Sequence, residues 1–474
     1  MCTKRKLFTQ QHTIVPSLYW EGKSSSFEVS PLPLQPIATY FSDSFTSINE
    51  LIFGDNLQVL ATLLETYEGK IDLIYIDPPF DSKANYKKRI ELKGTEKNKQ
   101  INVQQIQYTD RWEPAAYLQF IYERLILLHR LLAPTGSIYV HCDWRKAHSI
   151  KLVLDEIFGE ERYRNEIIWK RGTVKGAKAK GNQFARNHDS IFFYTKSEQY
   201  TFNRPYLPFD EAYKKRFNKD DKDGKGPYRD DQAIGTRSKQ TIEVMKKAGK
   251  IYKVKGKWRI KTYLQELQGI VVDDNWTDIS EVNVMSKDRT MYPTQKPEQL
   301  LTRIIEASTN EGDLILDCFC GSGTTAAVAA KLKRNFIAID NNIGAIMTTS
   351  RRLQQLQVPF QMVASKSTWP AFIPTTDYTI DLIEQTLHIH HIDFSLLKKQ
   401  VPQLRNIPFL HVIEQVEIDW QYDGEIFRPT QLQLATKHQA VPLVYNIPST
   451  MTKIALQITD VYMNVYFIVL PDLL

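Results

Sequence analysis

Short apolar runs alternate with amphipathic segments along much of the chain. Residues 71–76 (IDLIYI) form a nearly continuous apolar run, typical of a strand buried on both faces of a parallel sheet. Residues 113–132 carry apolar side chains at helical spacing, with Glu-Pro at the start and Pro134 just beyond the end. A strand at 137–141 and a helix at 145–158 follow. Alternating strands and helices predict the α/β fold class.

The alternation breaks near residue 171 and returns near residue 297. Residues 172–289 contain loop-like and basic segments instead. The pattern then resumes as a helix at 297–308, a strand at 313–317, a helix at 324–333 and a strand at 336–340. We therefore predict one α/β domain that is split by a central insert.

A different pattern begins near residue 366. Residues 412–427 alternate, with Val416, Ile418 and Trp420 on one face and mostly polar residues on the other. Asp423-Gly424 then supplies a hairpin turn. The predicted organisation is an N-terminal arm without clear periodicity (1–45), the first half of the α/β domain (46–171), the insert (172–289), the second half (290–365) and a small β-rich domain (366–474).

The composition narrows the class of protein. The 474 residues are 42% hydrophobic and 24% charged, which is ordinary for a globular chain, and no run is long and apolar enough to span a membrane. The first residues lack the apolar block of a signal peptide, so we expect a cytoplasmic protein without a membrane partner. Its few scattered cysteines predict neither a disulfide framework nor a metal site. The cysteines are Cys2, Cys142, Cys318 and Cys320.

Charge is concentrated in the central region. The formal net charge is only +7, but residues 170–186 and 246–261 contain several Lys and Arg and no Asp or Glu. Tyr252 and Trp258 are interleaved in the second stretch. A basic stretch can simply be a solvated face, whereas two of them with aromatic residues favour a polyanionic partner.

The segment LILDCFCGSGTT (314–325) reads as a strand, a glycine-rich turn and the start of a helix. Gly321 and Gly323 allow a tight turn and close approach of a ligand, and Asp340 ends the next strand 19 residues after Gly321. A ribose hydroxyl suits that carboxylate, and a carboxylate or phosphate suits the helix start. The loop alone leaves a dinucleotide and S-adenosylmethionine both open, beside a purely structural turn.

A second unusual segment, Asp77-Pro78-Pro79-Phe80, follows the apolar run at 71–76. A residue before proline is held extended, and proline has no N–H, so this segment offers rigid hydrogen-bond acceptors beside an aromatic face. Such a cluster suits the amino group of a planar base. An ordinary turn with an exposed Asp is the alternative.

The chemistry of an amino group on a base explains why these residue types would be needed. Its nitrogen is a poor nucleophile because the lone pair is delocalised into the ring. Two acceptors on its N–H bonds favour a tetrahedral nitrogen, and the charge of Asp77 stabilises the positive charge gained during methyl transfer. Phe80 can stack on the base. The base must leave a duplex to reach such a pocket, which implies base flipping.

Several motifs together resemble the DNA amino-methyltransferases that modify adenine N6 or cytosine N4, in the group whose catalytic motif precedes the cofactor motif. The motifs are FGDNLQVL (53–60), DPPF (77–80), FIYERL (120–125), GSIYVHCDW (136–144), YPTQKPEQLL (292–301) and DCFCGSGTT (317–325). The resemblance implies a circularly permuted Rossmann-like, S-adenosylmethionine-dependent methyltransferase domain with the insert as target-recognition region. It departs from the family at Cys318-Phe319-Cys320, where many members carry Pro and a small residue, and this puts local packing in doubt.

The resemblance also assigns roles to residues. The catalytic residues would be Asp77, Pro78, Pro79 and Phe80. The cofactor pocket would be lined by Asp55, Lys296, Asp317, Phe319, Gly321, Ser322, Gly323, Thr324 and Asp340. His141, Cys142 and Asp143 could be read as a catalytic cluster, but the chemistry needs no nucleophilic side chain, so we favour a role in the pocket wall.

The leading Asp of DPPF favours adenine, because family members that act on cytosine usually carry Ser there. Cytosine N4, an RNA or protein amino group, and a binding module without activity remain alternatives.

Expected DNA contacts are Lys87, Lys88 and Arg89, in a polar, strand-poor stretch from residue 83 to about 107, and Lys175, Lys178 and Lys180 in the insert. That stretch is either a disordered surface loop or a mobile loop that closes over DNA. Expected partners are double-stranded DNA, a cognate restriction endonuclease subunit and a second copy of the chain.

Overall fold

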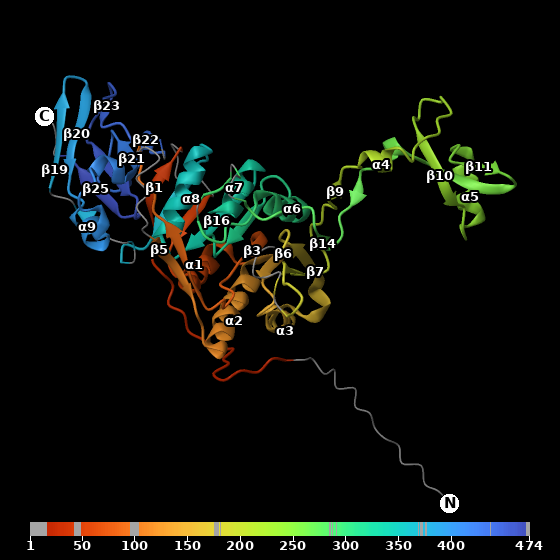
Figure 1. Ribbon diagram of the computed structural model, residues 1–474. Helices are drawn as coiled ribbons and strands as arrows, with labels where there is room; N and C mark the ends of the chain where they lie inside the picture. The colour runs from red at the N-terminus through yellow and green to blue at the C-terminus, as the bar shows by residue number, and fades with distance from the viewer. Residues whose placement is uncertain are drawn as a thin grey trace, which may run out of the picture. The chain divides into compact units, whose positions relative to one another are not determined.

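A computed structural model describes residues 17–41, 49–94, 104–174, 180, 182–283, 286, 288–290, 292–367, 369, 373–374, 377–436 and 438–470. The chain divides into two compact units. The larger unit comprises residues 1–202 and 274–474, and the smaller unit comprises residues 203–273. A ten-stranded mixed sheet lies at the centre of the larger unit (Figure 1).

The strands of this central sheet do not follow chain order. The order is β1 (Gln35–Tyr40), β17 (Phe360–Ala364), β2 (Glu50–Phe53), β16 (Asn335–Asp340), β15 (Leu314–Asp317), β3 (Ile71–Ile76), β6 (Leu132–Cys142), β8 (His188–Thr195), β7 (Tyr163–Lys170) and β14 (Asn275–Trp276). The strands from β17 to β6 run parallel to one another, and β1 and β8 flank them in antiparallel pairing. Strand β15 pairs with β3, with Leu316 opposite Ile74, although more than two hundred residues separate them.

Helices cover both faces of the sheet. Helices α1 (Asn56–Tyr67), α2 (Pro114–Leu131) and α3 (Ala147–Phe158) pack on one face, and α6 (Glu298–Ser308), α7 (Thr324–Lys331) and α8 (Ile343–Gln355) pack on the other (Figure 1). Local signals fix their starts: the Asp55 side chain caps α1, Pro114 is the first residue of α2, and the Asn342 side chain caps α8. The α/β prediction is confirmed.

Three stretches that were predicted to lack strands of the α/β domain contain strands. Strand β1 lies in the predicted N-terminal arm and pairs antiparallel with β17. Strand β8 lies in the predicted insert, yet it is a buried member of the central sheet, so the smaller unit is narrower than residues 172–289. The stretch expected to be strand-poor contains β4 (Ala84–Arg89) and β5 (Gln104–Asp110), which pair as an antiparallel hairpin.

The smaller unit is built around one three-stranded sheet. It contains β9 (Tyr206–Leu207), α4 (Glu211–Lys214), β10 (Tyr228–Ala233), α5 (Lys239–Lys247), β11 (Ile251–Val254), β12 (Lys257–Tyr263) and β13 (Ile270–Val271). The basic stretch at 246–261 runs from the end of α5 through the β11–β12 hairpin. There the ammonium groups of Lys246 and Lys253 lie 5.6 and 5.2 Å from the Trp258 ring, so cations surround an aromatic face.

The C-terminal part of the larger unit is β-rich, as predicted. One sheet contains, in order, β18 (Ile373–Pro374), β25 (Val465–Val469), β24 (Ala455–Asp460), β21 (Ile413–Asp419) and β22 (Gln431–Leu434). A second sheet contains β19 (Tyr378–Ile383), β20 (Thr386–Ile392) and β23 (Val444–Asn446). Helix α9 (Ser395–Gln400) lies between β20 and β21 in the chain. Asp423-Gly424 lies in the connection between antiparallel β21 and β22, which is longer than a two-residue turn. None of the described helices is long and apolar enough to cross a membrane.

Both faces of β21 are buried. Its apolar face belongs to the core of the C-terminal sheets. Its polar face meets α8: the fully buried Glu417 accepts hydrogen bonds from Gln354 of α8 (2.9 Å) and from Gln457 of β24 (2.5 Å). The alternation of apolar and polar residues along β21 therefore places one face in an apolar core and the other in a buried polar contact with α8.

Replacing a central residue of β15 should destabilise the larger unit. Leu316 is fully buried, so Leu316→Ala should lower the free energy of unfolding by about 2–5 kcal/mol through lost apolar contacts and a residual cavity. Leu396 of α9 is exposed, and Leu396→Ala should stay within about 0.5 kcal/mol of the parent. Urea unfolding measures both, and equal midpoints would contradict the position of Leu316 in the core.

Candidate active site

The two unusual segments of the sequence lie side by side at one edge of the central sheet. DPPF follows β3 and the glycine turn follows β15, and these neighbouring strands are parallel, so their carboxyl ends coincide. Each segment lines a cavity, which we call the DPPF cavity (about 690 Å³) and the glycine-loop cavity (about 250 Å³). The two cavities have a common wall of Asp77, Pro79, Tyr108, Thr294, Gln295 and Lys296.

The backbone after the two prolines is held by one buried carboxylate. Asp110, at the end of β5, accepts hydrogen bonds from the N–H groups of Phe80 (3.2 Å), Asp81 (2.9 Å) and Ser82 (2.8 Å). Asp81 in turn accepts from the Trp112 N–H (3.0 Å) and forms an ion pair with Lys146 (3.0 Å). These bonds fix the direction in which DPPF leaves the sheet.

The two carboxylate oxygens of Asp77 differ in their surroundings. Its Oδ2 pairs with the ammonium group of Lys296, whose Nζ also lies 5.3 Å from the Phe80 ring centre. Its Oδ1 is buried and has no hydrogen-bond partner within the described part of the chain. A buried acceptor without a partner is costly, so this atom is suited to a donor supplied by a ligand.

His141 lies behind DPPF in a buried chain of polar contacts. Its ring stacks on Phe80, with centroids 5.9 Å apart. Its nitrogens contact the Tyr75 hydroxyl (2.9 Å) and the Asp189 carboxylate (3.2 Å). Burial raises the pKa of Asp189, but the hydrogen bond from His141 and the charges of His141, Lys296 and Arg171 outweigh burial and lower it. His141 is fully buried and does not itself line the DPPF cavity, unlike Asp143, so its contact with the cavity is through the Phe80 ring.

The rim of the DPPF cavity presents aromatic rings beside cations. Trp144 is 39% exposed, with the guanidinium of Arg186 3.6 Å and that of Arg145 5.0 Å from its ring centre. On the hairpin, Tyr86 stacks on Tyr108 at 4.7 Å. Flat rings next to positive charges suit bases and phosphates.

Carboxylates dominate the glycine-loop cavity. Asp317 accepts hydrogen bonds from the Thr325 hydroxyl (2.5 Å) and the Phe319 N–H (3.0 Å), and Asp340 accepts from the Gly321 N–H (2.9 Å). Burial raises the pKa of Asp317 to about 7, with added repulsion from the Asp77 and Asp340 charges, and burial raises the pKa of Asp340 to about 6.

The glycine turn is fixed by α8. Gly323 has φ of +69°, and a Cβ there would lie 2.5 Å from Thr349 of α8, so no other residue fits without displacement. Arg352 of α8 donates to the Ser322 carbonyl (3.2 Å) and the Thr324 hydroxyl (3.0 Å). The loop therefore takes its shape from the helix that follows the next strand.

The lining of this cavity fits S-adenosylmethionine. Asp55, which caps α1 and lies 3.5 Å from Arg124, adds a further carboxylate to Asp77, Asp317 and Asp340. A surplus of negative charge suits the sulfonium and ammonium groups of this ligand. Aromatic side chains that could contact its adenine ring also line the cavity: Trp112, Phe120, Tyr292 and Phe319.

Most predicted site residues lie in these cavities. The four DPPF residues line the DPPF cavity. The predicted cofactor residues Asp55, Lys296, Asp317, Phe319, Gly321, Ser322, Thr324 and Asp340 line the glycine-loop cavity. Gly323 lies behind it, against α8. Lys296 also lines the DPPF cavity and pairs with Asp77.

The predicted DNA contacts are scattered. Lys87 and Lys180 are exposed, whereas Lys88 lines a third cavity and not the DPPF cavity. The Arg89 side chain, Lys175 and Lys178 lie outside the described residues. Sequence reasoning missed Tyr108, Asp110 and Asp189, because their roles depend on a hairpin and a strand that the pattern of apolar positions did not reveal.

In this α/β sheet, a glycine-turn cavity adjoins a second, acceptor-lined cavity at the carboxyl ends of parallel strands, which is where α/β proteins bind their ligands. The chain belongs to the DNA methylase family, whose profile matches residues 71–350. The predictions of a DNA methyltransferase and of S-adenosylmethionine as its cofactor are thereby confirmed.

Three relatives illustrate the similarity. The type II methyltransferase M.EcaI of Enterobacter cloacae is 32% identical over 328 residues, covering 64% of this chain and 69% of that protein. The DNA adenine methyltransferase YhdJ of Escherichia coli is 27% identical, covering 64% and 82%. The probable type III HindVI Mod subunit of Haemophilus influenzae is 26% identical, covering 63% and 49%, so this chain spans about half of that subunit.

Two glycines with positive φ allow a controlled test of the loop. Gly323→Ala combines a backbone strain of about 1–2 kcal/mol with a clash against Thr349. Gly312 has φ of +89° but open space around it, so Gly312→Ala carries the backbone strain alone. We expect Gly323→Ala to lower the unfolding temperature further and to weaken binding of S-adenosylmethionine at least tenfold. Equal binding by the two variants would show that the close contact with α8 does not shape the site.

Proposed function

We propose that this enzyme transfers a methyl group from S-adenosylmethionine to the N6 amino group of adenine at a specific site in double-stranded DNA, with the target base flipped out of the duplex. The observation that carries this proposal is the common wall of the two cavities, because a donor in one and a base in the other meet at Asp77. Holding both partners in contact is itself a large contribution to the rate.

In this proposal Asp77 is the catalytic carboxylate. Its free Oδ1 accepts one N–H of the amino group, and a proline carbonyl of DPPF accepts the other. The nitrogen lone pair then turns toward the incoming methyl group. As the N–C bond forms and the sulfur–carbon bond breaks, the amino group becomes positively charged, and Asp77 stabilises that charge. The nitrogen afterwards loses one proton to solvent or to a nearby acceptor.

Phe80 and Lys296 position the reacting groups. Phe80, supported from behind by His141, gives the base a flat face to stack on. Lys296 binds Oδ2 of Asp77 and so leaves Oδ1 as the oxygen that can accept from the base. The sulfonium donor supplies the methyl group, and the carboxylates of the glycine-loop cavity would hold its cationic end.

Adenine is the proposed target for two reasons. The segment begins with Asp, which in the family resemblance goes with adenine. One relative with 82% of its length covered, YhdJ, is named a DNA adenine methyltransferase. Analysis of nucleosides released from DNA methylated in vitro should show N6-methyladenine, and N4-methylcytosine in its place would overturn the choice of base.

The proposed methylation of DNA also implies the partners of the protein. DNA would be held by the cationic rim at Arg145 and Arg186 and by exposed Lys87 and Lys180. Relatives named as Mod subunits support a cognate restriction endonuclease subunit as a further partner. We also propose a homodimer as the working form. In a bacterium the substrate lies in the cytoplasm.

Removing the charge of Asp77 should abolish turnover without abolishing donor binding. Asp77→Asn keeps the shape of the side chain but loses the negative charge, so the methylation rate should fall by about 10²–10³-fold. Binding of S-adenosylmethionine should change only a few-fold, since the other carboxylates remain.

The matched control is Asp313→Asn, just before β15 at the opposite edge of the sheet. Its methylation rate should equal that of the parent. Measuring methyl incorporation into DNA and donor affinity for both variants tests the assignment, and normal turnover by Asp77→Asn would refute it.

Donor affinity should depend on pH. The pKa of Asp317 is raised to about 7, so this carboxyl is largely neutral below pH 7 and anionic above it. Cationic groups of the donor favour the anion, so affinity should fall as pH is lowered from 8 to 6, approaching tenfold per unit. Calorimetry at several pH values measures this, and Asp317→Asn should flatten the curve. A constant affinity in the parent would contradict the assignment.

A further inference from the structure

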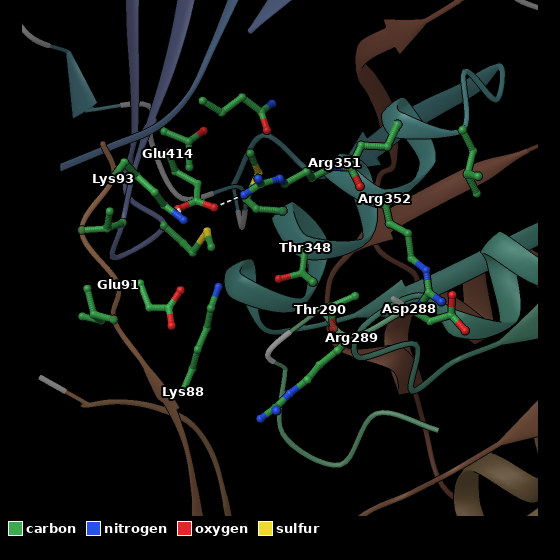
Figure 2. A pocket seen from close by; sticks show the side chains of 18 of the residues that line it. Lys88, Glu91, Lys93, Asp288, Arg289, Thr290, Thr348, Arg351, Arg352 and Glu414 are labelled. Atoms are coloured by element: carbon green, nitrogen blue, oxygen red, sulfur yellow. Dashed lines mark hydrogen bonds and ion pairs between the residues drawn. The ribbon is translucent and has the colours of Figure 1, made fainter. Parts of the chain in front are cut away.

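A third cavity, of about 380 Å³, lies between the α/β sheet and the C-terminal sheets (Figure 2). Its walls come from the end of β4 and the segment after it, from residues 288–290, from α8, and from the C-terminal sheet that contains β21 and β24. All of these segments belong to the larger unit. The cavity is separate from the two that form the candidate active site, and the methyl-transfer proposal makes no use of it.

Two carboxylates in this cavity are each shared by two cations. Glu414 of β21 pairs with Lys93 (2.8 Å) and with Arg351 of α8, and Figure 2 shows these side chains converging. Glu298 of α6 pairs with Lys331 (2.6 Å) and Arg352 (2.7 Å). Each group of three therefore keeps an excess of one positive charge.

Two further cations of this cavity form no ion pair with any residue that the structure describes. Among the described residues, neither Lys88 nor Arg289 forms an ion pair, and both line the cavity. Figure 2 shows Lys88 reaching from its strand into the space below Lys93 and Arg351. Glu91 and Asp288 also line the cavity, so six cationic side chains face four anionic ones, a surplus of two positive charges.

The pKa of Lys88 is lowered by its burial and by the neighbouring cations. Burial, followed by repulsion from Lys93 and Arg351, lowers the pKa of Lys88 to about 7 despite the opposing charge of Glu91. Burial and the charge of Arg351 likewise lower the pKa of Lys93 to about 8. Cations held together in a partly dehydrated cavity are destabilised until an anion joins them.

We propose that this cavity is a binding site for a phosphate group. A phosphate ester carries about −1.5 to −2 charges at neutral pH, and an anion in the cavity favours the charged forms of Lys88 and Lys93, so that the surplus of two positive charges is complete when the phosphate is bound. The Arg289 guanidinium offers a fork of donors that suits phosphate oxygens, and the Lys88 ammonium adds a mobile point charge. The phosphate can belong to a small molecule or to the DNA backbone, because both present the same group.

Titration of pyrophosphate into the full-length protein, in a buffer without phosphate or sulfate, tests the site by calorimetry. Lys88→Gln removes a cation from the cavity, whereas Lys87→Gln removes the exposed neighbouring cation, which does not line the cavity. We expect saturable binding by the parent, about tenfold weaker binding by Lys88→Gln, and a change of less than about twofold for Lys87→Gln. Lys88→Arg should restore most of the affinity.

Competition with a short duplex separates the two sources of phosphate. If the duplex displaces pyrophosphate, and Lys88→Gln weakens the duplex as well, the site takes a backbone phosphate; if the duplex does not compete, it takes a small phosphorylated molecule. Absence of saturable binding of pyrophosphate and inorganic phosphate at millimolar concentrations would overturn the proposal. Equal losses for Lys87→Gln and Lys88→Gln would overturn it too.

The test does not depend on the proposed methyl acceptor. Asp77→Asn should bind pyrophosphate as the parent does, since Asp77 lies outside this cavity. An unchanged unfolding temperature for Lys88→Gln shows that a loss of binding is local. A failure of this proposal would therefore leave the methyl-transfer proposal standing, and the reverse also holds.

Discussion

The parallel pairing of β3 with β15 is the contact on which the active site depends. Main-chain hydrogen bonds between these strands hold Leu316 opposite Ile74 and so bring their carboxyl ends to the same edge of the sheet. DPPF continues one strand and the glycine turn continues the other. Two segments more than two hundred residues apart thereby acquire a common wall, at Asp77 and Lys296. Every catalytic role proposed for them requires this adjacency.

Charge is distributed in opposite ways in two parts of the larger unit. Carboxylates outnumber cations in the glycine-loop cavity, and burial there raises the pKa values of Asp317 and Asp340. Cations outnumber carboxylates in the third cavity, and burial there lowers the pKa of Lys88. Buried groups of like charge are stabilised by a ligand of the opposite charge. The same physical rule therefore suits one cavity to a sulfonium compound and the other to a phosphate.

Helix α8 connects the site to the C-terminal sheets. On one side Thr349 and Arg352 fix the glycine turn. On the other side Arg351 and Gln354 meet the buried carboxylates of β21. Polar contacts at such an interface must be satisfied together, which makes the fit between the helix and the sheet specific. The C-terminal part is thus packed against the helix that shapes the cofactor loop.

The sequence by itself determined the features that are local. The strand at 71–76 and the helix at 113–132 could be recognised because periodicity and end signals lie within each segment, and the acceptor character of DPPF follows from the missing N–H of proline. Only the tertiary structure decided that β8 joins the central sheet, that Asp110 holds the DPPF backbone, and that Lys88 lines the third cavity and not the DPPF cavity. A strand's partner and the surroundings of a charge depend on residues far away in the chain, so no local pattern contains them.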